Sequence, residues 1–245
     1  MLLTTIGTSP SPRYPGSVFI LGDTGKQYFE PVGTCFAISP RYVLSVRHNL
    51  DPGNVKRATG YAIALTMSKS KSGVVHIDGR RDLVVHKYNT EMDYVILKLT
   101  DSDNGADLRP IPISIRPVEE DTDIKVFHCP VGVYNEGAVD DLSVLTSWVK
   151  SARPTRHHII CSGGLFPGSS GAPFVVREGF VIGMHVESIN CQVSIPEDEY
   201  DSLEIISETV NSNSHSHASL CRALVFGSCK KLVAELELIG VELRK

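Results

Sequence analysis

Three short segments of the chain carry side chains that together could catalyse a nucleophilic reaction. His48 closes one β-type run, Asp93 opens another, and Ser170 lies in the glycine-containing loop 167–173. A serine hydroxyl is a weak nucleophile at neutral pH unless a nearby base accepts its proton, and a histidine can be that base. Each residue alone has an ordinary structural explanation, at a strand end or in a turn. Together they supply a nucleophile, a base and a carboxylate that could orient the base.

In the order histidine, aspartate, serine, these segments resemble the catalytic triad of the chymotrypsin-fold, or trypsin-like, serine proteases. The resemblance implies that Ser170 rather than Ser169 is the nucleophile, because the family places the nucleophile directly before a glycine. His48 would then be the general base, and Asp93 would hold its imidazole in the right tautomer. The backbone N–H groups of Gly168 and Ser170 would form the oxyanion hole.

Ser169 carries a second implication of this resemblance. Secreted trypsin-like zymogens have an aspartate at that position, which receives the charge of a newly cut N-terminus, and a serine cannot form that ion pair. The chain also shows no activation sequence before Val18. The resemblance therefore implies an enzyme of the non-zymogen type, similar to HtrA-like and viral processing proteases.

Substrate specificity is expected to depend on the strand that follows the serine loop. The string 183–186, Gly-Met-His-Val, resembles picornaviral processing proteases, whose matching histidine recognises a P1 glutamine, and glutamyl endopeptidases also place a histidine there. By this resemblance His185 contacts the carbonyl oxygen of a P1 Gln or Glu side chain, with Leu165, Val186 and Ser188 as further substrate-binding residues. Leu165 stands where those enzymes usually have Thr or Ser, so a small or medium apolar P1 residue remains open. A buried structural histidine is the other interpretation of His185.

The composition fits a folded domain that acts on polypeptides. Hydrophobic residues make up 42% and charged residues 21% of the 245 residues, which allows a sizeable core. The net charge of −4 provides no basic surface for nucleic acid or an anionic membrane. No apolar run approaches the ~18 residues of a membrane span. We therefore expect a polypeptide substrate, and the chemistry requires neither a metal nor a cofactor.

The six cysteines favour a reduced protein over a disulfide-bonded one. Their spacing contains no C-x-x-C and no metal-ligand pattern with the histidines. Secreted trypsin-like enzymes usually carry a bridged cysteine directly after the catalytic histidine, and here that residue is Asn49. The first residues lack the basic flank and long apolar region of a signal peptide. We expect mostly reduced, buried cysteines and a cytoplasmic rather than a secreted protein.

Short β-type runs separated by turn residues predict an all-β fold. One set of runs lies at 17–21, 27–38, 42–46, 60–66, 73–77, 82–86 and 94–99, and a second at 123–129, 143–150, 158–161, 173–177 and 180–186. A polar, proline-bearing linker, roughly 101–120, lies between the sets. Two clusters of about six strands predict two packed, six-stranded antiparallel β-barrels of the chymotrypsin type. The expected limits are 15–105 and 120–210, within one peptidase unit over 1–245.

The C-terminal part of the chain shows a different pattern. Its apolar residues recur at spacings of four, four, three and four, at Cys221, Val225, Cys229, Leu232 and Leu236. Such spacing is typical of one face of a helix, so we predict a C-terminal α-helix over 215–238. Docking on the second barrel is the ordinary role of such a helix in trypsin-like domains. Binding a partner or a second copy of the chain is the alternative.

These patterns lead to one functional hypothesis with two rivals. The chain is expected to be a serine endopeptidase that works through an acyl-enzyme. A processing protease with very narrow peptide targets is a related possibility. A catalytically silent pseudoprotease, which keeps the fold as a protein-binding module, is the rival from another functional class.

Overall fold

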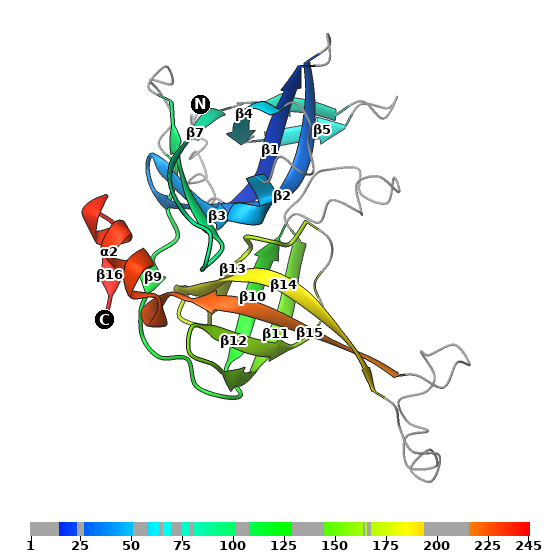
Figure 1. The fold of residues 1–245 in the computed structure, drawn as a ribbon, viewed down its shortest axis with the longest axis vertical. Helices are drawn as coiled ribbons and strands as arrows, with labels where there is room; N and C mark the ends of the chain where they lie inside the picture. The colour runs from blue at the N-terminus through cyan, green and yellow to red at the C-terminus, as the bar shows by residue number, and fades with distance from the viewer. Residues whose placement is uncertain are drawn as a thin grey trace, which may run out of the picture.

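The computed structural model describes residues 15–23, 27–50, 58–63, 66–69, 75–78, 81–100, 108–128, 145–163, 165, 168–193 and 216–245. Figure 1 shows two β-sheet lobes, one above the other, with a single labelled α-helix beside them. The fold is therefore mostly β, as the alternation of short apolar runs and turn residues predicts.

The first lobe is a closed barrel of six strands in the order β1-β2-β3-β8-β7-β4. The strands are β1 (Pro15–Asp23), β2 (Gln27–Ser39), β3 (Tyr42–Val46), β4 (Ala58–Ile63), β7 (Arg81–Asn89) and β8 (Tyr94–Leu99). A separate hairpin is formed by β5 (Thr66–Lys69) and β6 (Val75–Asp78), and the short 3-10 helix η1 (Arg47–Leu50) follows β3. Closure leaves the barrel without a free edge and fixes where each strand ends.

The second lobe is a curled sheet that contains β10 (Asp123–His128), β11 (Leu145–Pro154), β12 (His158–Ser162), β13 (Pro173–Val176), β14 (Val181–Val193) and β15 (Ser216–Val225). Strand β13 pairs with both β10 and β14, so these six strands pair in a ring. Two short strands, β9 (Ile113–Ser114) and β16 (Leu243–Arg244), extend the sheet in parallel beyond β14. The predicted chymotrypsin-like pair of six-stranded units is confirmed.

Both faces of the strands nearest the second lobe are buried. Within β2 and β3, Cys35 and Val43 point into the first barrel, whereas Phe36 and Leu44 pack in a cluster that includes Met184 of the second lobe. This two-sided burial explains why these strands read as nearly continuous apolar runs rather than as an alternation. The shared cluster holds the two lobes together along the strands that lead to the site.

The prediction of a helix over 215–238 is wrong for its first half. Residues 216–225 form strand β15, which pairs with β12 and β14, and the α-helix α2 spans only Lys230–Leu238, after the 3-10 turn η4 (Phe226–Ser228). The expected limit of 120–210 for the second barrel therefore omits one of its strands. Cys221 and Val225 are four residues apart, and residues at that spacing share a face in a strand as well as in a helix. Ala223 lies in the same core cluster as these two residues, whereas Leu224 lies in the cluster shared by the two lobes, so the side chains alternate between two cores with a period of two.

Helix α2 packs onto the core through Leu232 and Leu236, which join the cluster shared by the two lobes. This contact agrees with the docking role expected for the helix, and partner binding through it stays a prediction. Cys35, Cys161, Cys221 and Cys229 are all buried, as expected for these cysteines. Among the described residues no helix is long and apolar enough to cross a membrane.

Candidate active site

His48 and Asp93 meet at the end of two paired strands. Strands β3 and β8 are antiparallel, and Val46 at the end of β3 lies opposite Tyr94 at the start of β8. The residues just beyond these ends are therefore adjacent, although they are distant in sequence. His48 Nδ1 lies 2.6 Å from Asp93 Oδ2, and the backbone N–H of His48 donates to Asp93 Oδ1 at 3.0 Å.

This pair has the geometry of a base and its orienting carboxylate. Because the Nδ1–H donates to Asp93, the other ring nitrogen, Nε2, is left as the proton acceptor. The His48 side chain is 42% exposed and that of Asp93 25%, so the ring is accessible while its partner is more protected. Asp93 has a φ of 52°, in the left-handed region that aspartate tolerates better than most residues.

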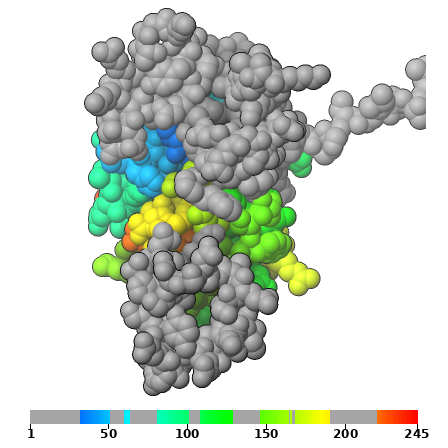
Figure 2. All heavy atoms as spheres, turned by 90° about the vertical axis from the view of Figure 1, so that its right-hand side faces the viewer, coloured from blue at the N-terminus to red at the C-terminus, as the bar shows by residue number. Residues whose placement is uncertain are grey.

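Ser170 is held against the first barrel through its own carbonyl group. Its backbone oxygen accepts hydrogen bonds from the Thr34 N–H and from Asn49 Nδ2, each at 2.9 Å. Asn49 directly follows His48, so this contact places the serine beside the histidine. Figure 2 shows the blue segment of the first barrel directly against the yellow segment of the second on this face of the molecule.

Gly171 makes this approach possible. A Cβ at this position would lie 2.1 Å from the Thr34 carbonyl oxygen and 2.6 Å from Ser45 Oγ, and its φ is +89°. A side chain is excluded both by the close contact and by the backbone conformation. The glycine after Ser170 is thus required where the serine loop meets the first barrel.

The Ser170 hydroxyl has a hydrogen-bond partner in the described part of the chain, whereas the N–H groups of Gly168 and Ser170 have none there. Ser170 Oγ donates to the carbonyl oxygen of Val186 at 3.5 Å, and among the described residues no hydrogen bond joins it to His48. The backbone N–H groups of Gly168 and Ser170 donate to no group in the described part of the chain. Gly168 has a φ of +89°, and its carbonyl oxygen accepts from Thr34 Oγ1 at 2.8 Å. Two unpaired amides beside a serine are what an oxyanion site needs.

His185 lies in the second lobe, on β14, with only 2% of the residue exposed. Its ring stacks parallel to Phe174, with centroids 6.1 Å apart. Burial, with smaller contributions from the nearby His128 and His48, lowers the pKa of His185 to about 3, so the ring is uncharged at neutral pH. Its Nδ1 has no hydrogen-bond partner among the described residues. A buried polar atom without a hydrogen-bond partner is rare in folded proteins and costs free energy.

The other expected substrate-binding residues lie around this ring. Ser188 Oγ donates to the Leu165 carbonyl oxygen at 3.1 Å and lies 3.5 Å from His185 Nε2. Val186 is buried and offers the carbonyl oxygen to which Ser170 donates. The structure therefore brings all four residues, Leu165, His185, Val186 and Ser188, to the Ser170 side of the second lobe.

A model of the trypsin-like peptidase domain matches residues 33–184. The chain belongs to the trypsin-like peptidase family. The matched segment includes His48, Asp93 and Ser170 and ends just before His185, and proteases of this family hydrolyse proteins. No curated protein matches the chain.

Solved structures resemble this peptidase in fold. The inactive form of a serine-to-alanine mutant of Rv3671c from M. tuberculosis H37Rv superposes with a TM-score of 0.53 at 15% identity, over 91% of this chain and 88% of the other. The HtrA-type protease AlgW, bound to a decapeptide, gives a TM-score of 0.57 at 12% identity, over 92% of this chain. The match spans 63% of the AlgW chain. These similarities establish the chymotrypsin-like fold.

Sequence reasoning missed several residues that shape the peptidase site. Thr34 and Asn49 anchor the serine loop, and Ser45 Oγ donates to the Thr34 carbonyl oxygen at 2.7 Å while accepting from Asn49. His128 contacts Ser169 directly behind the loop. These residues belong to no motif, and the one sequence signal that could have pointed to any of them is a polar residue within an apolar run, as at Ser45 in 42–46.

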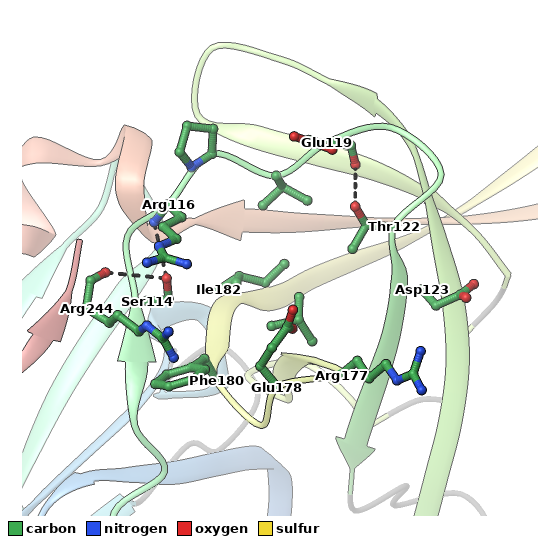
Figure 3. A pocket seen from close by; sticks show the side chains of 13 residues that line it. Ser114, Arg116, Glu119, Thr122, Asp123, Arg177, Glu178, Phe180, Ile182 and Arg244 are labelled. Carbon is green, nitrogen blue, oxygen red and sulfur yellow. Dashed lines mark hydrogen bonds between the residues drawn. The ribbon is translucent and has the colours of Figure 1, made fainter.

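A separate pocket of about 320 Å³ lies between the segment after β9, the β13–β14 turn and β16. Figure 3 shows Arg116 and Arg244 on one side of it and Glu119 and Asp123 on the other, with Ile182 in its wall. None of the candidate triad residues lines it. Its charges of both signs indicate no particular class of ligand.

Proposed function

We propose that this peptidase is a serine endopeptidase in which His48, Asp93 and Ser170 act as a catalytic triad. The observation that carries the proposal is the 2.6 Å contact between His48 and Asp93. Ser170 lies beside this pair, because its carbonyl oxygen accepts a hydrogen bond from Asn49, the residue after His48. Such a pair can accept a serine proton and stabilise the imidazolium that results. The two unpaired amides of the loop support the same chemistry.

The reaction follows from these positions. The Ser170 hydroxyl rotates from Val186 toward His48 Nε2, gives up its proton and attacks the scissile carbonyl carbon. The negative charge that develops on the carbonyl oxygen is stabilised by the N–H groups of Gly168 and Ser170. His48 then protonates the leaving amine, and water hydrolyses the acyl-enzyme by the same steps in reverse. Beyond His185, β14 pairs with no strand other than β15 among the described residues, so its other edge near Ser188 can offer backbone groups for pairing with an extended peptide.

A P1 glutamine is the substrate residue that His185 favours in this proposal. The ring is uncharged at neutral pH, so it can donate one N–H to a carboxamide oxygen but offers no positive charge to a carboxylate. Its place beside Ser188 and Leu165 supports this role. We therefore place Gln above Glu, and both above a small apolar residue.

A fluorophosphonate probe tests the nucleophile. The wild type should be labelled, Ser170→Ala should not, and Ser162→Ala, which removes an exposed serine hydroxyl on β12, should be labelled like the wild type.

Peptides that differ only at P1 then test the role of His185. The peptide with Gln at P1 should exceed the peptide with Ala by about tenfold in kcat/KM, the value of one neutral hydrogen bond. Equal cleavage of both peptides would remove the P1 proposal.

A catalytically silent protein-binding module is the second candidate. One observation favours it, namely that Ser170 Oγ is bonded to the Val186 carbonyl oxygen and not to His48. In that case the folded wild type would remain unlabelled by the probe at any concentration. Labelling of the wild type that disappears in Ser170→Ala would support the serine endopeptidase and rule out the silent binding module.

A further inference from the structure

A row of three hydrogen-bonded polar side chains, two of them buried, lies directly behind the serine loop. Ser169 Oγ lies 2.7 Å from His128 Nδ1, and His128 Nε2 lies 2.7 Å from Ser147 Oγ. Ser169 and His128 are both fully buried. His128 is the last residue of β10, and Ser147 lies on β11. These hydrogen bonds therefore tie the serine loop to the second lobe.

The histidine in this row is uncharged. Burial lowers the pKa of His128 to about 4, so at neutral pH one ring nitrogen carries a hydrogen and the other accepts one. Each serine hydroxyl can either donate or accept, which lets both contacts form whichever tautomer is present. A buried ring with hydrogen-bond partners at both nitrogens is held in a single orientation.

Two side chains of the segment 168–171 hydrogen-bond to the second lobe, Ser169 to His128 at 2.7 Å and Ser170 to the Val186 carbonyl oxygen at 3.5 Å, and that of Ser169 is the shorter contact. The backbone of the segment is tied to both lobes, since the carbonyl oxygens of Gly168 and Ser170 accept from groups of the first barrel and the Gly171 N–H donates to the His185 carbonyl oxygen at 2.8 Å. Gly168 and Gly171 both have φ values of +89° and lack a Cβ that would restrict their rotation. The Ser169 side chain lies between these two glycines, so its 2.7 Å contact with His128 helps to set the direction of the peptide groups on either side of it.

From this arrangement we infer that His128 is a positioning residue for the oxyanion site, acting through Ser169. Its contact fixes the residue between the two amides that would face the developing oxyanion, so that both amides point in the same direction before substrate arrives. The inference rests on the proposed function, because only an acyl-transfer enzyme needs these amides. It gives a role to a buried histidine that the triad does not use.

Two substitutions of His128 separate its two contacts. The side-chain amide of asparagine reaches the place of Nδ1, whereas that of glutamine reaches the place of Nε2. His128→Asn should keep the contact with Ser169 and retain kcat within about threefold, the value of a weakened hydrogen bond. His128→Gln and Ser169→Ala should each lower kcat by about 10- to 100-fold with little change in KM, since a misplaced oxyanion donor costs somewhat less than a deleted one.

The rate must be expressed per competent active site. Titration with the fluorophosphonate counts the sites, so a variant that merely folds less well loses titre and keeps its kcat. Ser151→Ala is the matched control, because it also removes a buried serine hydroxyl from the second lobe, one that accepts from the Thr122 N–H and lies away from the loop. It should keep kcat per site.

The outcomes are distinct. A labelled wild type together with an unchanged kcat per site in Ser169→Ala overturns the positioning role and leaves the proposed function standing. Equal losses in His128→Asn and His128→Gln overturn the route through Ser169. A wild type that the probe does not label overturns the proposed function and this inference with it.

Discussion

Asp93 meets two demands with one short side chain. Its carboxylate accepts from both the ring and the backbone N–H of His48, and its own φ of 52° lies in a region that costs most residues about 1–3 kcal/mol. Aspartate is among the few residues that adopt this conformation readily. The turn and the hydrogen bonds to His48 therefore select the same residue type for different reasons.

Replacing this carboxylate by an amide isolates its chemical role. In Asp93→Asn the backbone conformation is tolerated, but the amide donates a hydrogen to His48 Nδ1 and forces the proton onto Nε2. His48 can then no longer act as the base, and kcat should fall about 10⁴-fold with little change in thermal stability. Peptide hydrolysis and the melting temperature measure the two effects.

Asp121 provides the matched control for this change, because it is the other non-glycine residue with a positive φ among the described residues, at 59°. Asp121→Asn should leave kcat unchanged. A kcat for Asp93→Asn that stays within about tenfold of the wild type would contradict the assignment of the triad.

The candidate reactive residues could be predicted from the sequence, but the residues that hold them in place could not. His48, Asp93 and Ser170 could be identified because each lies at a strand end in a recognisable order. Asn49 and His128 could not, because their roles depend on partners 121 and 41 residues away that no local pattern reveals.

Helix α2 links the C-terminal part of the chain to the strand beside Asp93. The Tyr94 hydroxyl donates to Glu235 Oε2 at 2.9 Å, and Tyr94 directly follows Asp93. Burial and the Glu235 carboxylate raise the pKa of Tyr94 well above its ordinary value, so the hydroxyl remains a donor. The helix thus supports the start of β8 as well as covering the core.

The apolar face of this helix should contribute strongly to stability. Leu236→Ala would leave a cavity in the cluster shared by the two lobes and should lower the free energy of unfolding by about 2–5 kcal/mol. Leu238→Ala, at a position that is 85% exposed, should change it by less than about 0.5 kcal/mol. Urea unfolding of both variants measures the difference. Equal effects would show that α2 does not dock as described.

The strands were more predictable than the end of the chain. Turn residues bounded most strands of both lobes, so many of their limits lie within a few residues of the structure, although β14 continues to Val193 and β5 was not predicted as a separate strand. Strand β15 was misread because Cys221 and Val225 satisfy both a period of two and a helical period. Its pairing partners, β12 and β14, decide the outcome, and the spacing of apolar residues along one segment contains no information about them.

For the molecule as a whole, two buried histidines make folding sensitive to acid. The pKa values of His128 and His185 are lowered to about 4 and about 3, chiefly by burial. Below the ordinary value near 6.5 the unfolded chain binds protons that the folded chain resists. The stability present above pH ~6.5 is therefore lost as the pH falls toward these lowered values.

The expected slope is about 1.4 kcal/mol per pH unit for each of the two histidines. Urea unfolding between about pH 6.5 and pH 4.5 measures it. In His128→Asn one titrating group is gone, so the slope should become smaller by about that amount. Parallel pH dependences for the wild type and this variant would contradict the burial of an uncharged His128.

The carbonyl group of Ser170 has a consequence for the order of folding. It is bound by Thr34 and Asn49, so the reactive loop reaches its final place only when the second lobe docks on the first. During synthesis from the N-terminus, His48 and Asp93 can pair long before residue 170 is available. Hydrolytic activity should therefore be the last property that the folding chain acquires. An incompletely folded peptidase would then not cleave other proteins.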